Sequence, residues 1–291
     1  MGKLLLAAAV LAYGVAAGQD QRAPLVNNGA PMRVELDCDP SDLEALGLAC
    51  PPASPCDAYL ELSAVESADA RVFLMGNVHT DSVTMHSILL AASDSASIWS
   101  EPYARVRGAA LDRVQFLDKE TGWIGGQVVQ PLPRDPFLLK TSDGGVNWRR
   151  YPVLSESRAG AVDGFRFDSR TSGWLWIDRG FSGEVGGRYE RYESATGGES
   201  WMLREAVDRP PSEPGPQRTP AAWRLRPDGA ARAYRLERAV DGQWLTAASF
   251  LIPLGQCQTQ PGALAEPLPE EAPGAPATPG GRPPAPRRTK K

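Results

Sequence analysis

Apolar and polar residues in the central part of the chain alternate in a pattern of short segments. Runs rich in Val, Ile, Leu, Phe and Trp, such as PFLLK at 136–140, are bounded by turn-forming Gly, Asp, Ser and Pro. Apolar runs of this length with such boundaries are typical of β-strands rather than helices. The pattern therefore predicts an all-β protein.

One turn between two of these runs has an unusual composition. In TSDGGVNW, Thr141, Asp143 and Gly145 precede Trp148 by seven, five and three residues. We expect the hydroxyl and the carboxylate to accept hydrogen bonds from the turn's own N–H groups, and Gly145 to permit a positive φ. The Trp would then pack over the hairpin. The motif predicts a structural turn, because a metal site, the alternative, would need more ligands than Asp143 offers.

The same offsets recur before two further Trp residues. SATGGESW, ending at Trp201, keeps the hydroxyl and the Gly but has Thr196 in place of the Asp. ASDSASIW, ending at Trp99, keeps only the Asp, and AVDGQW before Trp244 is a remnant. The steps between these Trp residues are 49, 53 and 43 residues. The predicted structural turn residues are Thr141, Asp143, Gly145, Trp148, Ser194, Gly198, Trp201, Asp94 and Trp99.

A second marker precedes each of these turns. VQFLDKETGWIGG at 114–126 is similar to FRFDSRTSGWLW at 165–176, and VESADARVFLMGN at 65–77 is a fainter copy. Two markers that recur in phase indicate an internal repeat. We place the repeats at about 58–107, 108–159, 160–210 and 216–256.

The turn motif resembles the Asp-box, also called the bacterial neuraminidase repeat. The paired TGW and SDGGxxW phrasing resembles the photosystem II assembly and stability factor-like family of β-propellers, over roughly residues 60 to 250. The resemblance implies a propeller of four-stranded blades, each about fifty residues long. It says less about function, because Asp-boxes occur in sialidases, sorting receptors, glycosidases and non-catalytic scaffolds.

Family members usually have six or seven blades, whereas four repeats are visible here. Three arrangements are open: a compact four-bladed ring, a partial ring completed by a partner or a second copy, or further blades too degenerate to recognise. We favour the four-bladed ring. PMRVELDC at 31–38 would supply a strand that closes the ring on the last repeat.

The ends of the chain differ in composition from the repeats. Residues 1–18 have Lys3, an apolar core and small residues at the exit, which is typical of a cleaved secretory signal, with an uncleaved anchor as the alternative. We assign 19–57 to a Cys-rich segment, 58–257 to the propeller and 258–291 to a disordered Pro-rich tail. This organisation predicts an exported, periplasmic or extracellular protein without a transmembrane segment in the mature chain.

The four Cys residues are Cys38, Cys50, Cys56 and Cys257. An even number in an exported chain favours disulfides, and no CxxC spacing supports the rival zinc site. If all four pair, Cys257 must bond to one of the early three. Closure of the ring by the N-terminal strand would give Cys38–Cys257, with Cys50–Cys56 as the second bond.

Charge and motif content restrict the function. The formal net charge is −4; removing Lys3 with the signal and the tail from Pro261, with five basic and three acidic residues, leaves −7. A net negative charge of this size argues against binding of nucleic acid, whose phosphates attract positively charged surfaces. His79 and His86 with Asp81 would be the metal alternative, but we interpret NVHTDSVTMHS as a loop between strands. No GxSxG, HExxH or P-loop pattern is present.

These observations favour an exported, non-catalytic propeller that serves as a protein-binding scaffold or assembly factor, without cofactor or metal. The resembled family assists assembly of a membrane complex, so a membrane or envelope complex is the expected partner. The alternative is a carbohydrate-binding or sialidase-like propeller, although the Arg-Ile-Pro motif of sialidases is missing. The candidate contact residues lie in FSGEVGGRYERYES: Arg188, Tyr189, Arg191 and Tyr192.

Overall fold

The computed structural model describes residues 22–180, 187–209 and 222–259, and within them it contains one short helix, α1 (Pro40–Ala45), among many strands. The predicted signal lies outside the described residues, and so does all but the start of the predicted tail. Among the described residues, no helix is long and apolar enough to cross a membrane.

The strands form four antiparallel sheets, numbered here in chain order. Sheet 1 contains β2 (Cys56–Ala68), β3 (Arg71–His79), β4 (Thr84–Ser93) and β5 (Ile98–Ser100), extended by β1 (Leu25–Val26) beside β5 and β17 (Pro253–Cys257) beside β2. Sheet 2 contains β6 (Ala109–Phe116), β7 (Gly122–Val128), β8 (Arg134–Thr141) and β9 (Arg149–Pro152). Sheet 3 contains β10 (Ala161–Phe167), β11 (Gly173–Asp178), β12 (Tyr189–Ser194) and β13 (Met202–Val207). Sheet 4 contains β14 (Trp223–Asp228), β15 (Ala233–Val240) and β16 (Gln243–Leu251).

The first strands of sheets 1 to 3 share a backbone irregularity. The register shifts at Ser63 in β2, at Asp112 in β6 and at Asp163 in β10. Each shift follows an apolar residue at the corresponding position of its repeat: Leu62, Leu111 and Val162. A bulge of this kind bends its strand and increases the twist of the strand. The repeat is therefore visible in the backbone geometry as well as in the sequence.

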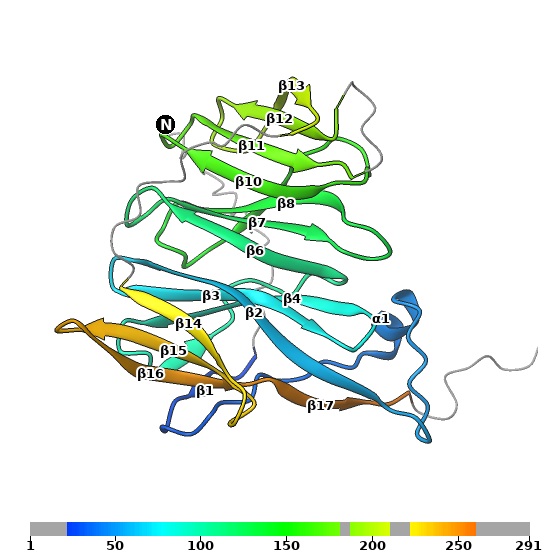
Figure 1. The fold of residues 1–291 in the computed structure, drawn as a ribbon, viewed down its shortest axis with the longest axis vertical. Coiled ribbons are helices and arrows are strands. Elements are labelled where there is room, and N and C mark those ends of the chain that lie inside the picture. The colour runs from blue at the N-terminus through cyan, green and yellow to red at the C-terminus, as the bar shows by residue number, and fades with distance from the viewer. Residues whose placement is uncertain (1–21, 181–186, 210–221, 260–291) are drawn as a thin grey trace, which may run out of the picture.

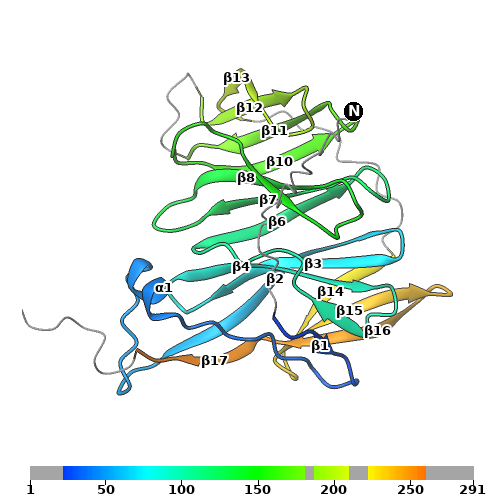
Figure 2. The ribbon, with the colours of Figure 1, turned by 180° about the vertical axis from the view of Figure 1, so that it is seen from behind.

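The predicted fold class is confirmed: the chain is all-β, and its successive antiparallel sheets are blades of a β-propeller. Figure 1 shows the blades as a stack in the order sheet 3, sheet 2, sheet 1, sheet 4, and Figure 2 shows the same order from behind. The last blade therefore packs against the first through β14 and β2. Sheets 3 and 4 stand at opposite ends of the stack, which is thus open rather than the closed ring we expected.

Three apolar cores lie between neighbouring sheets. Trp99, Trp223 and Phe250 belong to the core shared by sheets 1 and 4. Phe73 and Phe137 belong to the core between sheets 1 and 2. A third core between sheets 2 and 3 contains fully buried Trp123, Phe167 and Leu175. Full burial of one such side chain stabilises a fold by about 1.5–3 kcal/mol, so the interfaces between sheets hold the stack together.

The outward sides of the end sheets explain why the stack stays open. Strand residues alternate between faces, so Trp174 and Arg191 point away from the core that contains Leu175. In sheet 4 the residues opposite in direction to buried Leu236 include Arg235 and Glu237. Both end faces therefore carry charged side chains. These charges oppose close packing of sheet 3 onto sheet 4, although an indole also lies on each face, Trp174 on sheet 3 and Trp244 on sheet 4.

The N-terminal segment connects sheets 1 and 4. Val26 of β1 pairs with Ile98 of β5, and Met32 forms a parallel bridge with Phe250 of β16. The disulfides Cys38–Cys257 and Cys50–Cys56 are both present, as predicted. Residues 22–57 thus cover the outer edges of two sheets and are covalently joined to the last strand.

Candidate functional site

The turn at 141–148 forms a compact hydrogen-bonded unit. The Thr141 hydroxyl accepts the N–H of Gly145 at 2.9 Å and donates to Asp143 at 2.9 Å. Asp143 Oδ1 accepts the backbone N–H groups of Val146 and Asn147 at 3.1 and 2.9 Å. Partial burial acts to raise the pKa of Asp143, but hydrogen bonds from Asn147 and Thr141 outweigh it, so the pKa lies below its usual value. All of these contacts are internal, which is the geometry of a structural turn.

The turn at 194–201 repeats this arrangement with different side chains. The Ser194 hydroxyl accepts the N–H of Gly198 at 2.8 Å. Thr196 takes the position of Asp143, and its hydroxyl accepts the N–H of Ser200 at 2.9 Å. At 92–99, Ala96 has a φ of 52° and Trp99 donates to its carbonyl at 3.1 Å, although the hydroxyl and Gly are missing.

Replacing Asp143 with Ala should lower the free energy of unfolding by about 1–2 kcal/mol, because two backbone N–H groups lose their acceptor. Asp143→Asn keeps an oxygen and should cost less. Thr196→Ala, at the equivalent position, is the matched comparison and should also cost less, since it removes no charged acceptor. Urea denaturation at neutral pH measures all three variants. A larger loss for Thr196→Ala than for Asp143→Ala would contradict this account.

The second sequence marker links each blade to the next. The Phe73 ring lies against Gly145 of the following blade so closely that a Cβ there would be 2.4 Å away. Trp123 donates to the carbonyl of Gly197 at 2.9 Å and stacks on Phe167 at 3.8 Å. Trp174 is the corresponding residue of sheet 3. It lies on the end face, against which none of the other described sheets packs, because sheet 4 packs on sheet 1 instead. The markers thus hold blades together wherever a neighbour exists.

The predicted contact residues fall into two environments. Arg188 is exposed, and its guanidinium donates hydrogen bonds to both carboxylate oxygens of Asp178. Tyr189 is partly exposed, and the Arg188 guanidinium lies 5.1 Å from the centre of its ring. Arg191 lies across the end face of sheet 3, 5.9 Å from the centre of the Trp174 ring. Tyr192 instead points into the core between sheets 2 and 3. Residues 181–186 of the same loop lie outside the described part of the chain.

A buried polar cluster accompanies Tyr192, and the sequence analysis did not single it out. The Tyr192 hydroxyl donates to Glu190 at 2.7 Å, and Arg179 Nε lies 3.6 Å from the other Glu190 oxygen. Arg179 also donates to the carbonyl of Ala159, in the connection between sheets 2 and 3. Burial, followed by the hydrogen bond to Glu190, raises the pKa of Tyr192. The signal available in the sequence was alternation: Tyr192 shares a face with Leu175, its partner across the strands.

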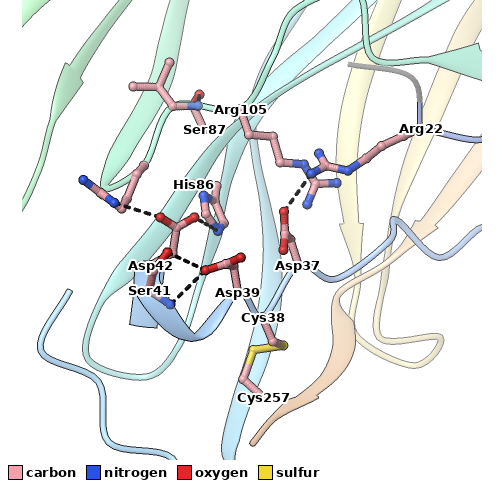
Figure 3. A network of polar contacts seen from close by, with 12 residues as sticks. Arg22, Asp37, Cys38, Asp39, Ser41, Asp42, His86, Ser87, Arg105 and Cys257 are labelled. Carbon is pink, nitrogen blue, oxygen red and sulfur yellow. Dashed lines mark hydrogen bonds and ion pairs between the residues drawn. A yellow bond between two sulfur atoms is a disulfide. The ribbon is translucent and has the colours of Figure 1, made fainter. Parts of the chain in front are cut away.

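A second polar network joins the N-terminal segment to sheet 1 (Figure 3). Arg22 binds Asp37 at 2.8 Å, and Asp42 of α1 binds Arg107 at 2.9 Å. His86 Nε2 is 3.9 Å from Asp42 and has no hydrogen-bond partner, although the side chain is buried. This arrangement fastens α1 onto the end of β4. It does not assemble a metal site: the described residues contain no group of three or more His, Cys, Asp or Glu suited to one.

The environment of His86 predicts a pH-dependent stability. Burial lowers its pKa below 6.5, opposed by Asp42 and Asp37 and assisted by Arg105 and Arg22. The unfolded chain therefore binds the proton more readily than the folded chain. The contribution of His86 to stability is complete above about pH 6.5 and is lost as the pH falls toward the lower folded value. Urea unfolding between pH 5 and 7.5 should show a smaller loss on acidification for His86→Gln than for the unmodified protein; parallel profiles would contradict this.

The fold and these contacts define the molecule as a propeller-type protein whose turns and interior clusters are structural. No protein-family model matches the chain, and no curated protein matches it. The similar solved structures include two at 17% identity. One, described as YCF48 bound to D1 peptide, gives a TM-score of 0.37 over 69% of this chain and 58% of that chain. The other, YCF48 from Cyanidioschyzon merolae, gives 0.34 over 66% and 57%. The chain thus spans less than two thirds of either, and scores of this size carry no functional argument.

Proposed function

We propose that this protein is an exported, non-catalytic scaffold that binds another protein through the exposed edge of sheet 3. The observation that carries the proposal is β13, an edge strand on which Met202 and Leu203 are 58% and 37% exposed. Exposed apolar side chains beside aromatic and Arg residues are typical of the centre of a protein contact. Partly exposed Trp201 and exposed Arg204 flank these two apolar residues in the chain. Tyr189 and Arg188 lie at the other end of the same edge, where Tyr189 pairs with Val207 of β13.

The two disulfides support export, since such bonds persist in oxidising compartments. An assembly role at a membrane or envelope complex is the finer form of the proposal. The open stack suits it, because the exposed end faces and edges are accessible to a partner.

One observation supports the carbohydrate-hydrolysing alternative, and another opposes it. Sialidases use a Tyr/Glu nucleophile pair, and Tyr192 with Glu190 forms such a pair at 2.7 Å. Both side chains are buried in a core, however, and the pKa of Tyr192 is raised. A nucleophile needs the opposite shift and access to substrate. The scaffold function is therefore the better supported.

The test is capture of partners from an envelope extract with the tagged mature chain. We expect one stoichiometric protein partner, which Met202→Glu with Leu203→Glu should abolish. Val146→Glu is the matched control, because Val146 is 50% exposed but lies in the turn of sheet 2. Capture that survives the β13 change would refute this contact surface. Turnover or saturable binding of an oligosaccharide would refute the scaffold function itself.

A further inference from the structure

The outward face of sheet 4 contains a pair of like charges in direct opposition. Arg226 of β14 is the cross-strand partner of Arg235 of β15, and both side chains are exposed. Like charges placed directly opposite each other destabilise a sheet. Asp228 reaches Arg235 at 3.4 Å, while the same carboxyl group also accepts two N–H groups of the adjoining turn. Arg226 forms no ion pair with any described residue.

A rigid aromatic platform lies beside this pair. Arg224 Nε is 2.5 Å from Glu237, whose side chain is only 10% exposed, and the guanidinium carbon lies 4.2 Å above the Trp244 ring. The charge of Arg224 is therefore neutralised internally. Its stacking holds the partly exposed indole flat against the sheet, because a cation over an aromatic face is attracted to it. Arg224 and Trp244 therefore form a platform that is ordered before any partner binds, and Arg226 takes no part in it.

The opposite end of the stack shows that this excess of cations is local. On the outward side of sheet 3, every Arg is accompanied by carboxylates: Arg166 by Asp168, Arg191 by Glu193 and Glu205, and Arg204 by Glu193. Among the described residues of the two end faces, only the sheet 4 face has an Arg without an accompanying carboxylate, namely Arg226. The chain as a whole has a net charge of −4, so this local cationic surface would attract anionic groups that the rest of the surface repels.

From this juxtaposition we infer that the outward face of sheet 4 binds an extended acidic segment of a partner protein. Carboxylates bind Arg through paired hydrogen bonds, and Arg and Trp dominate the binding energy of protein contacts. In an extended segment, side chains two residues apart lie on the same side about 7 Å from each other. Alternating acidic residues would therefore meet Arg226 and Arg235, while a residue farther along the segment and on the same side packs on Trp244. This surface is separate from β13 and does not depend on the function proposed for that strand.

The probe is a fluorescent peptide of about twelve residues that alternates Glu and Ser, with a Gln–Ser peptide as the uncharged control. Fluorescence anisotropy with the full chain should show saturable binding of the Glu peptide alone, weakening as salt is added. Arg226→Glu with Arg235→Glu should reduce affinity at least about tenfold, because each change turns an attraction into a repulsion. Trp244→Leu should reduce it less, about threefold, since the charges remain.

Arg166→Glu with Arg204→Glu, at the opposite end of the stack, is the matched control and should change the affinity less than about twofold. Unchanged near-ultraviolet circular dichroism verifies that the charge-reversal variants fold, and a cooperative urea transition verifies it for Trp244→Leu, which loses an aromatic chromophore. Equal losses in both charge-reversal variants, or equal binding of the Gln peptide, would overturn the inference. Binding of anionic lipid vesicles that depends on Arg226 while the peptide does not bind would also overturn it, in favour of a membrane surface. Met202→Glu with Leu203→Glu should leave peptide binding intact, which separates this inference from the β13 contact.

Discussion

Removing the Cys38–Cys257 bond should lower the free energy of unfolding by about 5 kcal/mol. The bond joins residues 219 apart, and the chain-entropy model gives a stabilisation of that size for so long a loop. Its removal also disconnects the N-terminal segment from the last strand, which stays paired with β2 through Cys257 and Cys56. The double variant Cys38→Ser with Cys257→Ser, unfolded in urea, measures the loss without an orphaned thiol.

The second disulfide supplies the control. Cys50–Cys56 closes a separation of only 6 residues, for which the same model gives about 2 kcal/mol. Cys50→Ser with Cys56→Ser should therefore be the milder change. If the two double variants lose equal stability, the long-range connection between the N-terminal segment and the last strand does not contribute as the structure indicates.

Replacing Trp148 with Ala should destabilise the protein by about 3–5 kcal/mol, the usual range for loss of a large buried aromatic. Trp148 is 8% exposed, and its ring lies edge-on to Phe73 of sheet 1 and Phe116 of sheet 2, at 5.9 and 6.0 Å. Its indole N–H donates to Gly145 at 3.2 Å. The residue therefore contributes to the turn and to the junction between two sheets.

Two comparisons sharpen this experiment. Trp148→Phe keeps an aromatic ring but loses the N–H bond to Gly145 and some volume, so it should cost less than the Ala variant. Trp201→Ala should also cost less, because Trp201 is partly exposed and its indole nitrogen has no hydrogen-bond partner. Urea denaturation compares the three. A loss at Trp201 that matches the loss at Trp148 would contradict the role assigned to the sheet 1–sheet 2 junction.

Local chemistry explains how much of the fold the sequence predicts. The hydroxyl of Thr141 and the carboxylate of Asp143 bond to groups within four residues, so their spacing alone specifies the turn. Short apolar runs bounded by turn-forming residues identify the strands, and repetition of both markers identifies the blades. The disulfide pairing followed from an even number of Cys residues and an N-terminal strand near the last repeat, and the structure contains that pairing.

Properties that depend on which sheets face each other could not be predicted from the sequence. Tyr192 was a candidate for partner contact, yet it lies in the core between sheets 2 and 3. Trp174 has the same marker position as Trp123, but none of the other described sheets packs against it. The other predicted contact residues, Arg188, Tyr189 and Arg191, lie on β12 and the loop before it, and their role in partner contact stays a prediction.

The sequence by itself determined the strands, the turns and the repeat, because these depend on residues close in the chain or on residue type; the pairing of Cys38 with Cys257, 219 residues apart, was a conditional expectation. Only the tertiary structure decided that the blades stack openly, with sheet 4 against sheet 1 and charged faces at both ends. It alone placed Arg226 opposite Arg235, since the register between β14 and β15 sets which side chains meet. Whether two sheets pack depends on the free energy gained by burying apolar surface and the free energy lost by burying charges, summed over whole faces. A local sequence pattern does not specify that sum.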